Sequence, residues 1–132
     1  MADVTATKAN VSLLNSGPTF RGTAGGTLTA GQAVYINGTS GVTAARANAA
    51  GTAKVAGVVV APKDAASGDP VDVAAPGALV GGFSGLTPGD MLYLSDTATG
   101  VLGTTPGTKA KPVARAISAT EIMITLEGTD PA

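Results

Sequence analysis

The chain has 132 residues and a mass of 12.6 kDa, with 44% hydrophobic residues, 3% aromatic residues and a formal net charge of −1. Its 8 basic and 9 acidic residues are thinly spread, which argues against nucleic acid as a partner, because that requires a dense basic patch. Cysteine and histidine are absent, which excludes disulfides, zinc-type metal sites, and Ser–His–Asp or Cys–His catalysis.

This length allows one domain, but we expect its core to be weak. Much of the hydrophobic share is alanine, which contributes far less than the roughly 1.5–3 kcal/mol of a buried Val or Leu. The 19 glycines each lose more backbone entropy on folding than any other residue type. We therefore expect a marginal monomer that gains stability by association.

The N-terminus shows no basic segment followed by an apolar one, and no apolar run approaches the 18 or so residues of a membrane span. We therefore expect a soluble chain made in a cytoplasm, with no membrane partner.

Residues 1–24 are polar and rich in Thr, Ser, Asn and Ala, and we predict an extended N-terminal arm there. Its candidate partner-binding residues are Val11, Leu13, Leu14, Phe20 and Arg21. The apolar run at 11–14 could add as a strand to a neighbour's sheet or pair with the chain's own sheet. Phe20 and Arg21 could anchor a partner, because such residues are enriched at interface hot spots. Alternatively, Phe20 docks on the chain's own core and Arg21 points to water.

Beyond the arm, glycine and proline separate short β-branched or alternating runs, which predicts an all-β barrel or sandwich. The predicted strands are 33–37, 54–61, 70–75, 91–95, 112–118 and 121–128. The alanine-rich segment 43–54 lacks an apolar stripe of helical period and contains Gly51. We predict a strand or loop there, with at most one helical turn.

An internal repeat organises this part of the chain. Residues 28–36 (LTAGQAVYI) recur 58 positions later as residues 86–94 (LTPGDMLYL). In each copy a glycine, Gly31 or Gly89, is predicted at the third position of a type II turn, where φ is positive. Replacing Ala30 with Pro, as in the second copy, is expected to be neutral or stabilising. The sequence thus predicts two pseudo-repeated β units, about 27–77 and 85–128, within a single β domain of residues 25–132.

Three carboxylates, Asp64, Asp69 and Asp72, come nearest to a calcium site. Their spacing is not that of an EF-hand loop, so we interpret the segment as a solvated turn. We expect no catalytic residue, no metal and no cofactor, and therefore no enzymatic activity.

The succession of motifs resembles the capsid cement, or head decoration, proteins of tailed bacteriophages. The motifs are L-T-x-G-x-x-V-Y-I (28–36), A-A-S-G-D-P-V-D-V (65–73), G-L-T-P-G-D-x-L-Y-L-S (85–95) and V-A-R-A-I-S (113–118). The resemblance covers about residues 27–127, and Arg115 stands where a glycine is common. It implies a small β-tulip-like barrel or sandwich that forms a homotrimer. It also implies attachment to the outer capsid surface, clamping of neighbouring major capsid protein subunits, and synthesis in the bacterial host cytoplasm.

The sequence leaves two other functions to compare. A tail or fibre module that contacts the host surface would share the Gly-, Thr- and Ala-rich composition. A small hydrolase or carbohydrate-binding domain is disfavoured, because the chain has no histidine and no tryptophan.

Overall fold

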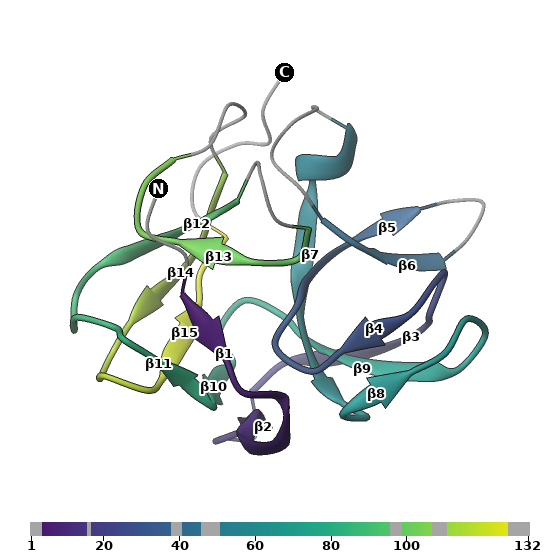
Figure 1. Ribbon diagram of the computed structural model, residues 1–132, viewed down its shortest axis with the longest axis horizontal. Helices are drawn as coiled ribbons and strands as arrows, with labels where there is room; N and C mark the ends of the chain where they lie inside the picture. The colour runs from purple at the N-terminus through teal and green to yellow at the C-terminus, as the bar shows by residue number, and fades with distance from the viewer. Residues whose placement is uncertain are drawn as a thin grey trace.

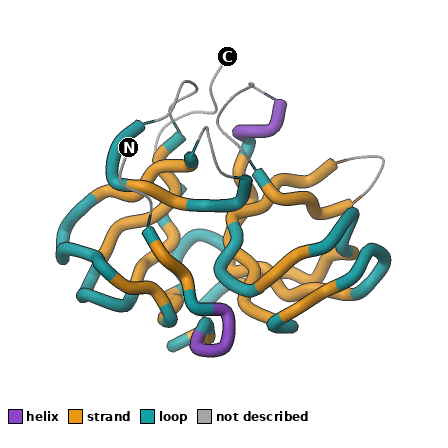
Figure 2. The backbone as a smooth tube through the Cα atoms, in the orientation of Figure 1, coloured by secondary structure: helices purple, strands orange, loops and turns teal. Residues whose placement is uncertain are grey.

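The computed structural model describes residues 4–15, 17–37, 41–45, 51–95, 99–106 and 111–126. The chain is all-β, as the sequence predicts, with two large antiparallel sheets and two short ladders. The sheets form two lobes that lie side by side (Figure 1), and short loops connect most of their strands (Figure 2). Among the described residues, the helical segments are two 3-10 turns, η1 (Lys8–Asn10) and η2 (Gly51–Ala53).

The first large sheet has five strands. Their order is β3 (Thr19–Thr23), β9 (Pro70–Ala74), β7 (Val55–Ala61), β5 (Ala33–Asn37) and β6 (Gly41–Ala44). Its two edge strands approach each other, because Ala24 forms a parallel bridge with Val42 and the Gly25 N–H donates to Val42 O at 2.8 Å. The sheet therefore curls almost into a closed barrel. A short ladder of β4 (Leu28–Thr29) and β8 (Asp64–Ala65) lies beside it.

The second large sheet has six strands. Their order is β13 (Leu102–Gly103), β12 (Met91–Leu94), β14 (Pro112–Ala116), β15 (Ile122–Ile124), β10 (Leu79–Gly81) and β2 (Ser12–Leu13). The other short ladder joins β1 (Thr5–Ala6) to β11 (Phe83–Ser84). The two sheets have the same topology: when their strands are ranked by position in the chain, the order β6-β5-β7-β9-β3 corresponds to β13-β12-β14-β15-β10. Strand β2 is an additional strand of the second sheet. The duplication of the sequence itself stays a prediction.

The six predicted strands are present as β5, β7, β9, β12, β14 and β15, most of them shorter than predicted. In the segment 43–54, β6 ends at Ala44 and one 3-10 turn forms at η2, while residues 46–50 lie outside the described part. The strands that the sequence did not predict are short, with two to five residues each. Two of them, β1 and β2, pair with segments far away in the chain.

The two predicted turns are confirmed. Gly31 has φ 98° and Gly89 has φ 91°. The residue after each glycine donates its N–H back to the threonine that begins the turn, Gln32 to Thr29 O at 3.3 Å and Asp90 to Thr87 O at 3.1 Å. In both copies the pairing register shifts just before the tyrosine of the strand that follows.

The extended arm predicted for residues 1–24 is not what the described part of this segment forms. Strand β1 pairs with β11, β2 with β10 and β3 with β9, so the segment adds to the chain's own sheets. Val4 and Val11 are 8% and 5% exposed and belong to the larger core. The partners of β1 and β2 lie more than sixty positions along the chain, which is why the local composition gave no sign of this pairing.

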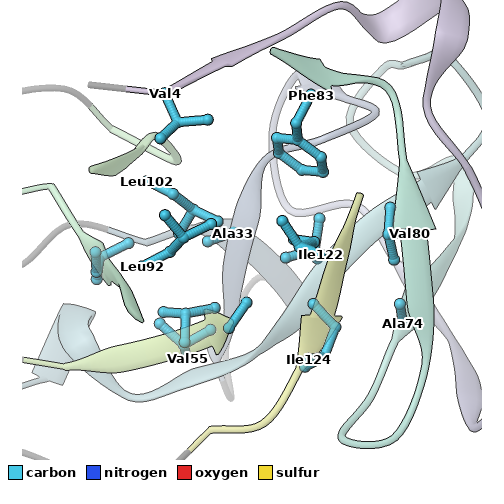
Figure 3. Packing of buried hydrophobic residues seen from close by; sticks show 14 of the residues in the cluster. Val4, Ala33, Val55, Ala74, Val80, Phe83, Leu92, Leu102, Ile122 and Ile124 are labelled. Atoms are coloured by element: carbon cyan, nitrogen blue, oxygen red, sulfur yellow. The ribbon is translucent and has the colours of Figure 1, made fainter. Parts of the chain in front are cut away.

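Two hydrophobic cores hold the sheets. The smaller core lies against one face of the five-stranded sheet and includes Leu28, Val34 and Val73. The larger core lies between the two sheets, where residues of the first, such as Ala33 and Ala74, face Leu92, Val80, Ile122 and Ile124 of the second (Figure 3). The five-stranded sheet therefore has a hydrophobic core against each of its faces, whereas the six-stranded sheet buries one face against the larger core.

The two turn glycines give a matched stability test. An alanine at Gly89 meets no atom within 4 Å, so Gly89→Ala adds only the cost of positive φ, about 1 kcal/mol. At Gly31 the new Cβ would lie 2.7 Å from Ala6 Cβ, so Gly31→Ala should lower the free energy of unfolding by about 2 kcal/mol or more. Urea unfolding of both variants measures the difference, and equal losses would contradict the packing of β1 on this turn.

The structure reverses the expectation for Ala30→Pro. The Ala30 N–H donates to Lys63 O at 3.0 Å, and proline cannot make this bond. We now expect Ala30→Pro to lower the free energy of unfolding by about 1 kcal/mol or more. A thermal melt compared with Ala30→Ser, which keeps the N–H, separates the lost bond from the changed side chain. A proline variant as stable as the wild type would contradict this role for the bond.

Candidate functional site

The five candidate binding residues do not form one site. Leu14 follows β2 at the edge of the six-stranded sheet and is 44% exposed. Val11 is buried and Leu13 is half-buried against the same larger core. Phe20 and Arg21 lie on β3 in the other sheet, where Phe20 packs against the smaller core and Arg21 is exposed. Residues 12–13 pair with the chain's own sheet and Phe20 packs on the chain's own core, as one of the two alternatives for each segment predicts. Val11 is buried and therefore not accessible to a partner.

Arg21 lines a shallow cleft of about 490 Å³, which we call the acidic cleft. Its other lining residues are Ala61, Pro62, Asp64, Asp69, Pro70 and Asp72. Of the three carboxylates singled out in the sequence, Asp64 lies on β8, Asp69 in the loop that follows and Asp72 on β9, and all three line this opening. The three carboxylates thus line one open cleft, in a segment that the sequence led us to interpret as a solvated turn.

Each carboxylate of the acidic cleft has a partner. Asp72 accepts from Arg21 Nε at 3.0 Å, and this hydrogen bond, together with the charge of Asp72, raises the pKa of Arg21. Asp64 lies 2.6 Å from Lys8 Nζ, and Asp69 accepts the Ala66 N–H at 2.9 Å. Within the described ranges, no group of three or more Asp, Glu, His or Cys side chains is arranged to hold a metal ion.

A second surface lies on the face of the six-stranded sheet that points away from the larger core. Directly opposed pairs form a row across the strands: Leu79 with Met123, Met123 with Arg115, and Arg115 with Met91. Leu14 extends the row, because its N–H donates to Leu79 O at 2.8 Å. We call these five residues the Leu–Met row.

Side chains of the Leu–Met row alternate with buried neighbours. Val80, Ile122 and Leu92 are fully buried, whereas the adjacent Leu79, Met123 and Met91 are partly exposed. This surface was not predicted from the sequence. Alternation of apolar and polar residues shows that a strand has two faces, but only the register between strands decides which of their residues lie side by side.

Ile117 follows β14 two positions after Arg115 and is 42% exposed. Its N–H donates to Glu121 O at 3.0 Å, which continues the pairing beyond the strand. Ile36, at the end of β5, is 64% exposed. Of the three large apolar side chains that are exposed in the described part of the chain, two therefore lie in or next to the Leu–Met row.

Comparison of the sequence with protein-family models and with curated proteins gave no match. The described residues contain no helix that is long and apolar enough to span a membrane.

Two neighbouring apolar residues test how the N-terminal segment is placed. Val11→Ala should lower the free energy of unfolding by about 2 kcal/mol, because Val11 is buried in the larger core. Leu14→Ala should cost about 0.5 kcal/mol or less, because that side chain is partly in water. Chemical denaturation of the two variants measures both values. A Val11→Ala variant with wild-type stability would show that the segment does not belong to the core.

Proposed function

We propose that this chain is a structural virion protein that binds the outer surface of a bacteriophage capsid and stabilises it by clamping neighbouring major capsid subunits. The observation that carries the proposal is the ordered succession of motifs that resembles capsid cement proteins. The motifs at 28–36 and 85–95 each form a type II turn that leads into a strand, at corresponding places in the two sheets. On this proposal the chain acts by contact and catalyses no reaction.

The surface of the chain is suited to contact with other proteins. Leu14, Ile36 and Ile117 expose large apolar side chains, and the Leu–Met row adds two methionines and a leucine. An apolar surface that includes a basic residue is typical of the centre of protein interfaces. Burial of such side chains against a capsid would stabilise both partners by mass action.

The proposal includes association of this chain with itself, as a homotrimer. The larger core contains many alanines, including Ala33, Ala74 and Ala114, which contribute little burial energy each. Association would remove additional apolar surface from water. The alternative function is a tail or fibre module that contacts the host surface, and the location of the chain in the virion distinguishes the two.

The location can be tested by electron microscopy of purified virions that carry a label fused after Ala132. We expect label over the capsid surface, and virions with the unfused label expressed in the host serve as the control. Label confined to the tail or its fibres would overturn the capsid proposal and favour the alternative.

Stabilisation can be tested with capsids assembled without this chain. We expect them to release their genome at a lower temperature than wild-type capsids, because the clamping contacts are absent. Addition of the purified chain should restore the wild-type release temperature. Capsids that bind the chain but gain no thermal stability would refute the clamping role.

A further inference from the structure

Residues 4–14, which we call the N-terminal strap, comprise β1, η1 and β2 and contact both lobes. In the lobe of the six-stranded sheet, β1 pairs with β11 and β2 pairs with β10. In the other lobe, Lys8 Nζ lies 2.6 Å from a carboxylate oxygen of Asp64, and Lys63 Nζ donates to Ala9 O at 2.7 Å. The strap therefore lies across the junction of the two lobes (Figure 1).

The strap fills a place that the other half of the molecule closes by itself. In the five-stranded sheet the two edges meet directly, through the bridge of Ala24 with Val42. In the other half the edge strand β13 is joined through the strap, because Val4 N–H donates to Leu102 O at 2.7 Å and the next residues of the strap pair with β11. The strap is therefore an addition to the arrangement of strands that the two sheets share.

Few buried side chains hold the strap in place. Of its eleven side chains, Val4 and Val11 are buried and seven are exposed. Its strands have two residues each, and its hydrogen bonds from Lys8 and to Ala9 are exposed. A segment with little buried apolar surface and exposed hydrogen bonds opens at a lower free energy than the core. We therefore expect the strap to open while both large sheets stay folded.

Opening of the strap leaves two surfaces that fit each other, the strap and the groove that it occupied. The groove presents the edges of β10 and β11, together with Phe83, which lies opposite Ala6 and is only 3% exposed while the strap is in place. An open strand edge of this kind pairs with an extended segment of another chain. A strap from a second copy is the segment whose fit to this groove the structure already shows.

The connection that follows the strap bends tightly. Asn15 Oδ1 accepts from the N–H groups of Gly17 and Leu79, each at 3.1 Å. A Cβ at Gly17 would lie 2.7 Å from Ala78 Cα, so the backbone passes close to the start of β10. The strap pairs in one lobe, whereas β3, the next strand, belongs to the sheet of the other. Short, crowded connections favour exchange of the segment that they carry between identical copies.

We propose that this chain associates with itself by exchange of the N-terminal strap, so that residues 4–14 of one copy pair with β10 and β11 of another. The strap keeps its contacts, but they now join two copies, and Val4 and Val11 are buried in the core of the neighbour. The exchange is reciprocal between two copies or closes around a ring of three. The inference rests on the self-association put forward above and deepens it. It does not depend on attachment to a capsid.

Engineered disulfides report the exchange directly, because the chain has no cysteine. Thr5 and Ser84 are directly opposed and exposed, so Thr5→Cys/Ser84→Cys allows a disulfide between β1 and β11. Oxidised at concentrations where the chain associates, this variant should form covalent species at multiples of 12.6 kDa on a non-reducing gel. The control, Arg21→Cys/Asp72→Cys, joins β3 to β9 outside the strap and should give the mass of a single chain.

A mixture of two single variants excludes linkage within one chain. Thr5→Cys and Ser84→Cys are unfolded together, refolded and oxidised, and the mass of the linked peptides should show positions 5 and 84 joined between copies. Thr5→Cys mixed with Asp72→Cys measures linkage by chance collision. An associated double variant that links only within single chains would overturn the exchange. A wild-type chain that is monomeric by sedimentation equilibrium would overturn both exchange and self-association, while the labelling of virions would still decide the capsid proposal.

Discussion

The fold depends on close packing between the two large sheets, because the chain has few large apolar side chains with which to fill a gap. On the five-stranded sheet, Ala33 and Ala74 keep the facing surface thin, so that the larger side chains of the other sheet reach it (Figure 3). Gly57 has the same effect within the first sheet, since a Cβ there would overlap the carbonyl oxygen of Ala74. Small residues at these positions are thus a condition of the packing and not only a weakness of the composition.

This shared core makes the two halves unequal. The five-stranded sheet has the smaller core on one face and the larger core on the other, whereas the six-stranded sheet has the Leu–Met row on its second face. A face that is buried in one half is therefore partly open to solvent in the other. The same inequality appears at the ends of β5 and β12, where Ile36 is exposed and its sequence counterpart Leu94 is fully buried. The proposed contacts with other proteins follow from this difference.

The sequence was informative where structure is local. The turns at Gly31 and Gly89 were predictable, because positive φ is the property that glycine provides, and the long β-branched runs gave six strands. The pairing of β1 and β2 with β11 and β10 was not predictable, because each strand has two or three residues and its partner lies far along the chain. The strand register also differs by one residue between the two sheets. Tyr35 lies opposite Val55, which the repeat aligns with Val113, but Tyr93 lies opposite Pro112. The Leu–Met row depends on this register, and so it could not be identified from the sequence.

Native-state hydrogen exchange tests most directly whether one core holds both sheets. Two amides are matched for this purpose: Val59 N–H donates to Gln32 O at 3.0 Å, and Ala116 N–H donates to Asp90 O at 2.9 Å. If the sheets share their core, neither half opens without the other, and both amides should exchange with the free energy of global unfolding. A difference of more than about 1 kcal/mol between the two exchange free energies would show that one half unfolds alone and would contradict the shared core.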